Sequence, residues 1–253
     1  MSDKKTERDR YDKKASRLLS KPKFDENAGS SEYSPQLRAP YLKYEDMHLK
    51  FINSDDHVLE IGAGTGTHTQ SLLKSGAFVT ATDISPNSVR VIKKRYKTYS
   101  ERLTVKVADM EFLPFNDNSF NVVCSAGSMS YGDNEVVMNE INRVLKPGGR
   151  VIIVDSLHEN PVYIANRYMG YLRGNRSLST LKRMPTLRLI HKYRERFDVK
   201  ELHFFGSLVW LSPLFSLLFG ERLAAKIVDK FDTLINVRRS AFKFLAVFLK
   251  NEF

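Results

Sequence analysis

Three glycines at alternating positions, followed by an acidic residue about twenty positions on, are the residues whose spacing best supports chemistry. Gly62, Gly64 and Gly66 follow the predicted buried strand 58–61. Such a turn lets the backbone approach a bound nucleoside without a Cβ clash, and the helix that begins behind it offers free N–H groups. Asp83 ends a second apolar run, where a carboxylate can accept hydrogen bonds from ribose hydroxyls. The spacing therefore predicts a nucleoside site.

The glycine spacing G-x-G-x-G, with Glu60 just before it, resembles motif I of class I S-adenosylmethionine-dependent methyltransferases more than a nicotinamide site. Three later segments, 108–110, 120–125 and 144–151, resemble the same family. They match its adenine-contacting motif, its fourth strand, and the helix–turn–strand signature that leads into strand five. The resemblance covers residues 58–156 and implies S-adenosylmethionine as the cofactor and methyl transfer as the reaction.

The resemblance also implies which residues hold the cofactor. Asp109 would accept from the adenine amine beside the backbone of Met110, and Ile84 would pack on the adenine ring. Glu60 would either reach the methionine amino group or stabilise the glycine turn. The expected set is Glu60, Gly62, Ala63, Gly64, Gly66, Asp83, Ile84, Asp109, Met110 and Ser125.

Apolar runs that alternate with helical segments predict a parallel sheet covered by helices on both faces. We expect strands at 57–61, 79–83, 103–108, 120–125, 151–156, 199–205 and 240–248, and helices at 67–75, 86–99, 134–145 and 186–197. The fold class is α/β: a Rossmann-like class I methyltransferase with a seven-stranded, mostly parallel sheet and a helical insertion after strand five. The expected parts are a helical cap over the cofactor site (1–50), a cofactor-binding core (51–157), and a basic helical insertion that also completes the sheet of the same domain (158–253).

Charge and cysteine content narrow the function classes. The net formal charge is +11, and residues 158–200 hold ten basic and three acidic side chains, against eleven and twelve in 51–157. That excess fits a solvated helical face, or a surface for a phosphorylated substrate or anionic lipid. The single cysteine, Cys124, excludes an intramolecular disulfide framework and lies in a predicted buried strand. With no secretory signal at the N-terminus, we expect a cytoplasmic location.

Methyl transfer by in-line displacement depends mainly on positioning, so weak catalytic motifs are expected. His158, just past strand five, and Tyr131 are the candidates for a general base, with Asp155 as a further one. The small residues of 125–131 would give the methionine moiety and the acceptor room. No Asn-Pro-Pro-Tyr motif follows strand four and no cysteine is placed to attack a pyrimidine, which argues against nucleic acid as a partner. No metal-ligand pattern is present in the sequence.

The acceptor is expected to contact the insertion, through Tyr163, Arg167, Arg173 and Arg176. Arginine binds phosphate in a bidentate manner, and tyrosine stacks on sugars and rings. The pattern of this segment resembles methyltransferases found with bacterial surface-polysaccharide synthesis. That resemblance implies a small phosphorylated or lipid-linked glycan acceptor, with a sugar hydroxyl as the preferred target.

Two alternatives stay open, as does the oligomeric state. The first is a carbon methyltransferase of polyprenyl quinone synthesis, peripheral at the inner face of the membrane. Residues 204–220 carry no charge but are too short for a span and contain Pro213, so they form core or an interfacial patch on a bilayer or another subunit. Trp210 and Phe215 would then contact the bilayer. The second is a non-catalytic cofactor-binding protein, against which the acids Asp83 and Asp109 argue.

Overall fold

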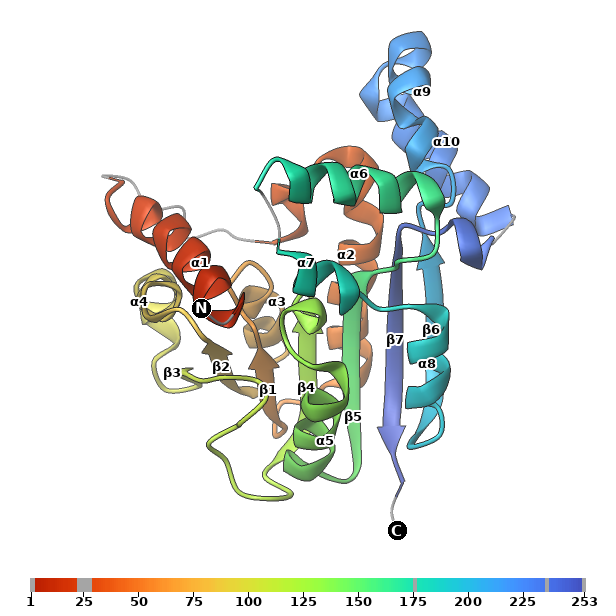
Figure 1. The fold of residues 1–253 in the computed structure, drawn as a ribbon. Coiled ribbons are helices and arrows are strands. Elements are labelled where there is room, and N and C mark those ends of the chain that lie inside the picture. The colour runs from red at the N-terminus through yellow and green to blue at the C-terminus, as the bar shows by residue number, and fades with distance from the viewer. Residues whose placement is uncertain (1–2, 22–28, 175–176, 235–236, 252–253) are drawn as a thin grey trace.

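A seven-stranded sheet runs through the centre of the structure, a computed structural model that describes residues 3–21, 29–174, 177–234 and 237–251 of the 253-residue chain. The strand order is β3-β2-β1-β4-β5-β7-β6, and β7 is antiparallel to both its neighbours whereas the other pairings are parallel (Figure 1). The strands are β1 His57–Ile61, β2 Phe78–Asp83, β3 Leu103–Val107, β4 Phe120–Ala126, β5 Leu145–Ser156, β6 Phe197–Phe205 and β7 Lys243–Lys250. The predicted mostly parallel, seven-stranded sheet is confirmed.

Helices cover both faces of this sheet. They are α1 Asp3–Leu19, α2 Pro35–Phe51, α3 Thr69–Lys74, α4 Pro86–Arg95, α5 Asn134–Val144, α6 Pro161–Leu172, α7 Leu178–Lys182, α8 Leu187–Tyr193, α9 Ser212–Phe219 and α10 Glu221–Leu234. In Figure 1, α5 and α8 lie on the near face and α2 on the far face, while α6 and α7 cross the upper edge. Helix α1 packs against α4, and α10 packs against α2 and α9.

Alternation along the central strands builds two apolar layers. Val151 and Ile153 of β5 pack on one face with side chains of α5 and α8. Ile152 and Val154 point to the other face, where they join side chains of α2, α3 and α4. Successive side chains of a strand point to opposite faces, so a strand covered on both sides is apolar at nearly every position. These two apolar layers hold the strands in place and so position the strand ends, where the site residues lie.

Local signals set the helix starts that matter for the site. Ser85 accepts a hydrogen bond from the Ser88 amide at the N-cap of α4, and Pro86 occupies the first turn, as expected. The predicted helix 134–145 ends at Val144, and the turn expected within 144–151 lies instead inside β5. Phe120 of β4 pairs with Leu145 and Val122 pairs with Arg150, so the register shifts between these two pairs. Residues 146–149, which include the two glycines, therefore bulge out of the pairing while β5 continues past them.

The uncharged stretch 204–220 is mostly surface rather than core. Phe204 is buried at the end of β6, but Leu217 and Leu218 of α9 are 83% and 62% exposed. Leu214 and Phe219 add to the same exposed apolar surface of α9. Within the ranges that the structure describes, every helix is too short or too polar to cross a bilayer.

Candidate functional site

The glycine turn between β1 and α3 has the backbone shape that only glycine adopts easily. Gly62 has φ 61°, and a Cβ there would collide with the side chain of Ser128. Gly64 has φ 57°, and nothing lies within 4 Å of the position its Cβ would take. The side of the turn at Gly64 is therefore open toward a ligand.

Asp83, the last residue of β2, faces this turn and is only 7% exposed. Its Oδ2 accepts the Gly64 amide at 2.8 Å and its Oδ1 accepts the Ser85 amide at 2.9 Å. Burial raises the pKa of this carboxyl, while the two backbone amides act in the opposite direction. The amides fix the orientation of the carboxylate and leave each oxygen with further accepting capacity.

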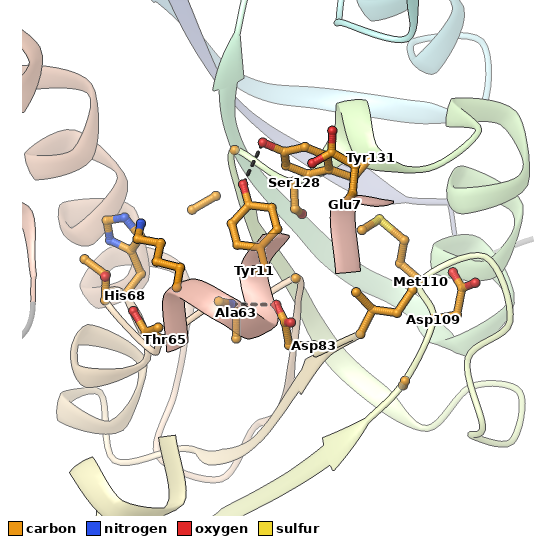
Figure 2. A pocket seen from close by; sticks show the side chains of 18 of the residues that line it. Glu7, Tyr11, Ala63, Thr65, His68, Asp83, Asp109, Met110, Ser128 and Tyr131 are labelled. Atoms are coloured by element: carbon orange, nitrogen blue, oxygen red, sulfur yellow. Dashed lines mark hydrogen bonds between the residues drawn. The ribbon is translucent and has the colours of Figure 1, made fainter. Parts of the chain in front are cut away.

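A cavity of about 170 Å³, called here the first cavity, opens between this turn, the end of β2 and the segment after β4. Figure 2 shows Asp83, Met110 and Tyr131 around it, with Tyr11 of α1 reaching across. Eight of the residues predicted from the sequence line it: Gly62, Ala63, Gly64, Asp83, Ile84, Asp109, Met110 and Tyr131.

Three of the predicted cofactor residues lie beside the first cavity rather than on its wall. Glu60 is 3% exposed beneath the turn, where its Oε2 accepts the Thr69 hydroxyl at 2.6 Å. The carbonyl of Gly66 accepts the hydroxyl of Tyr96 at 2.6 Å. The hydroxyl of Ser125 is buried and 2.7 Å from that of Ser128, which does line the cavity. This placement of Glu60 fits its second expected role, stabilising the turn.

Helix α1 covers the first cavity with four side chains that no local pattern in the sequence singles out. The Tyr11 hydroxyl donates to the Tyr131 hydroxyl at 2.6 Å, and Lys4 Nζ lies 2.7 Å from Asp109 Oδ2 and 2.6 Å from Glu111. Glu7 and Lys14 complete this wall. Lys4 thus contacts the carboxylate that was predicted to accept the adenine amine.

A second cavity, of about 260 Å³, adjoins the first. The two share Tyr33, Gly127 and Tyr131 as lining residues. Asp155 and Lys243 also line the second cavity, both of them buried. The residues shared between the cavities come from the segment after β4 and the segment just before α2, so the two cavities meet there.

A wider apolar groove, of about 870 Å³, adjoins the second cavity. Leu37 and Phe242 line both. The groove runs between the start of α2, helix α6 and the turn Val209–Leu211, with Tyr163, Met169 and Trp210 on its walls. The first cavity, the second cavity and the groove thus follow one another.

The other predicted catalytic and acceptor residues do not converge on the two cavities. His158 lines neither; Arg167 Nη1 lies 3.3 Å from its Nδ1, and burial followed by Arg167 lowers the pKa of His158. Arg167 is 6% exposed and donates to the Leu157 carbonyl at 2.7 Å, and Arg173 is exposed at the end of α6. Arg176 lies outside the described residues, and Tyr163 lines the groove.

The strand order, the glycine turn after β1 and the acid that ends β2 define the Rossmann-like fold of class I methyltransferases. Residues 59–153 match the family model described as a methyltransferase domain. The chain is 32% identical over 123 residues to a demethylmenaquinone methyltransferase of Tropheryma whipplei (strain Twist), covering 48% of this chain and 50% of that protein. It is 34% identical over 112 residues to sterol 4-C-methyltransferase strm-1 of Caenorhabditis elegans, covering 43% of this chain and 34% of that protein.

A solved structure shares the fold across most of the chain. It is geranyl diphosphate C-methyltransferase from Streptomyces coelicolor A3(2), in complex with Mg2+, geranyl diphosphate and S-adenosyl-L-homocysteine. The TM-score is 0.59 at 16% identity, over 92% of this chain and 87% of that one. By sequence, in contrast, the chain spans half or less of the length of the two curated relatives named above.

Proposed function

We propose that this protein transfers a methyl group from S-adenosylmethionine to a lipid-like acceptor with a flat polar head and a long apolar part, such as a polyprenyl quinol. The observation that carries the proposal is that the polar second cavity shares lining residues with the first cavity on one side and with the apolar groove on the other. An acceptor of this shape would place its head beside the cofactor and its apolar part in the groove. The names of the relatives, which include a demethylmenaquinone methyltransferase and a sterol C-methyltransferase, support this substrate class.

The donors and acceptors of the first cavity fit S-adenosylmethionine. Asp83, oriented by two backbone amides, would accept from the ribose hydroxyls, and the open side of Gly64 gives the backbone close access to the ligand. Asp109 and Ile84 would hold the adenine, once Lys4 gives up part of its contact with Asp109. When bound, this cofactor supplies an electrophilic methyl group on a sulfonium. The residues of the chain then bind both partners and exclude water, and such positioning is a major source of rate.

The sugar-hydroxyl acceptor expected from the insertion is less well supported by the structure, because those of the expected arginines that the structure describes do not line the two cavities. Arg167 is directed to a backbone carbonyl, and Arg173 lies on the surface. Part of the basic excess in 158–200 is neutralised on α5, where Glu135 forms ion pairs with Lys192 and Arg196 at 2.7 and 3.3 Å. Those contacts favour the solvated-face interpretation of the basic segment.

The proposed function is tested by giving the purified protein methyl-labelled cofactor and a chemically reduced bacterial lipid extract, with an aqueous extract in parallel. We expect label in the organic phase, and more of it after reduction, because only the quinol carries aromatic hydroxyls. Mild acid, which cleaves glycosyl phosphates, should leave the label in the lipid. Label confined to the aqueous phase, or released by the acid, would instead support a sugar acceptor, and label in nucleic acid would reject both.

We also propose that α9 brings the groove to a membrane surface. Trp210 lines the groove at 40% exposure, Phe215 is half-buried, and the Gln36 amide contacts the Ser216 hydroxyl at 3.4 Å, which holds α9 beside the start of α2. Leu217 and Leu218 extend the exposed apolar surface. Exposed basic residues follow on α10, namely Arg222, Lys226 and Lys230, a combination that suits an anionic bilayer.

Replacement of Leu217 and Leu218 by serine should release the protein from vesicles that contain anionic phospholipid. Each buried leucine contributes about 1.5–3 kcal/mol, so we expect at least a roughly tenfold loss of partitioning in flotation assays. Leu49→Ser, at a residue 67% exposed on α2, is the matched control and should float like the wild type. Equal flotation of the double variant and the wild type would assign the contact to another surface.

A further inference from the structure

Lys243 places a buried cation at the start of β7, on the wall of the second cavity. The residue is 5% exposed and pairs with Ser156 of β5, whose hydroxyl lies 3.4 Å from its Nζ. The ammonium also lies 4.9 Å from the ring centre of Tyr41 and 5.4 Å from that of Phe242. A charge held this far from water is costly unless its surroundings compensate it, which makes the position a candidate for function.

The carboxylate that acts on Lys243 is Asp155, the residue before Ser156 in β5. Asp155 is 2% exposed, and its two oxygens accept the amides of Met129 at 3.0 Å and Ser156 at 2.6 Å. Burial raises the pKa of Asp155, whereas the charge of Lys243 counteracts this shift. The second cavity therefore contains one cation and one carboxyl group that is able to take up a proton.

Tyrosine side chains, together with Ser130 and Ser156, supply the other polar groups of this cavity. Tyr33 and Tyr41 stack with their ring centres 3.8 Å apart, and Tyr131 lies on the side shared with the first cavity. Burial raises the pKa of Tyr41 to about 12 and also raises that of Tyr33, so both hydroxyls stay protonated at neutral pH. The charged and titratable groups that bear on the site include these three tyrosines, Asp155 and Lys243, with Arg167 and Tyr193 interacting electrostatically with Asp155.

We propose that Lys243 binds the ionised hydroxyl oxygen of a flat aromatic acceptor whose ring lies against the aromatic side chains of the second cavity. The O–H bond of the acceptor breaks, its proton passes to a carboxylate oxygen of Asp155, and the electron pair stays on the acceptor oxygen beside the Lys243 ammonium. The net charge of the cavity is unchanged by this transfer. The oxyanion raises the electron density of the neighbouring ring carbons, which then act as nucleophiles toward the methyl group.

The charge balance favours this ligand over a phosphate. A single ammonium, already opposed by Asp155, compensates one negative charge that arises within the site, but not a dianion that arrives from solvent. The proposal rests on the proposed function for the identity of the reaction. Its binding step, however, can be measured without turnover.

The test titrates 1-naphthol bound to the protein that has been saturated with S-adenosylhomocysteine, following the naphtholate absorbance as the pH rises. We expect the wild-type site to favour the naphtholate, lowering the ionisation midpoint of the bound probe below that in buffer. Lys243→Met should abolish this preference and weaken naphtholate binding by about ten- to a hundredfold, while Lys243→Arg, which keeps the charge, should retain most of it. Lys200→Met, at an exposed lysine of β6, is the matched control.

Lys243→Met should still unfold cooperatively on heating and should bind S-adenosylhomocysteine like the wild type, which separates loss of the anion site from loss of the fold. If Lys243→Met does not fold or does not bind S-adenosylhomocysteine, Lys243→Arg and Lys243→Gln provide the same comparison of the ionisation midpoint with and without the positive charge. The same ionisation midpoint for bound naphthol with and without the ammonium, or no binding to the wild type, would overturn the proposal. A lowered midpoint without methylation of any lipid would keep the anion site and reject the proposed function.

Discussion

Asp83→Asn is expected to weaken the binding of S-adenosylhomocysteine by about 3 kcal/mol, or roughly a hundredfold, because hydrogen bonds to a charged acceptor contribute about 1.5–3 kcal/mol each. The carboxylate is 7% exposed and already holds the amides of Gly64 and Ser85, so it is fixed in place before the ligand arrives. An asparagine of the same shape turns one of its two acceptors into a donor, which must then face an amide or a ribose hydroxyl. Titration calorimetry measures the change directly.

Two controls test whether the loss of binding is specific to the site. Asp198→Asn, at an exposed aspartate of β6, removes one carboxylate without touching the first cavity and should bind like the wild type. Circular dichroism should give the same spectrum for both variants, since the asparagine keeps the volume of the side chain. A dissociation constant within about twofold of the wild type for Asp83→Asn would place the ribose elsewhere in the cavity.

The half of the site around the glycine turn follows from the sequence because its residues occupy fixed positions at strand ends. Gly62, Gly64 and Asp83 follow β1 and end β2, and parallel pairing of these strands brings their carboxyl ends together. An apolar run read from the sequence therefore fixes both the strand and the position of the polar residue after it. Eight predicted residues reach the first cavity for this reason.

The second cavity, where we propose that the acceptor binds, is formed by residues far apart in the chain, and their spacing in the sequence does not predict these contacts. The second cavity joins Tyr41 of α2, Asp155 of β5 and Lys243 of β7, which come together only when β7 inserts between β5 and β6. Arg167 is a residue for which the sequence suggests the wrong environment. Its charge predicts a surface role, but its spacing of four residues from the buried Tyr163 puts both on the inner side of α6.

For the cap over the first cavity, the sequence predicts a helical segment but not its packing against the rest of the protein. Residues 1–50 are polar and helix-forming, which indicates helices but not where they pack. Asp12 helps to hold α1 against α4, since its carboxylate accepts the Ser85 hydroxyl at 2.8 Å and the Asn87 amide at 2.9 Å at the start of α4. Those bonds lower the pKa of Asp12 and add a second acceptor to the N-terminus of α4.

Glu60→Gln should make the protein more resistant to unfolding at alkaline pH, by an amount that grows as the pH rises from 4.5 to 8. Burial raises the pKa of Glu60 from 4.5 to about 8 in the folded protein, with the Thr69 hydroxyl acting against the shift and the charge of Asp83 adding to it. Between these values the folded state holds a proton that the unfolded chain has released. Wild-type stability therefore falls with rising pH across this window, and the glutamine removes that dependence.

The expected difference between Glu60→Gln and the wild type grows by about 4 kcal/mol between pH 4.5 and 8, since each pKa unit corresponds to about 1.4 kcal/mol. Urea unfolding at several pH values measures it, and the comparison between variants cancels groups such as His48, whose lowered pKa acts in the opposite direction. Glu101→Gln, at an exposed glutamate, should shift stability equally at every pH. A similarly constant offset for Glu60→Gln would mean that Glu60 is ionised in the folded protein, and its carboxylate would then be available to a cationic ligand of the glycine turn.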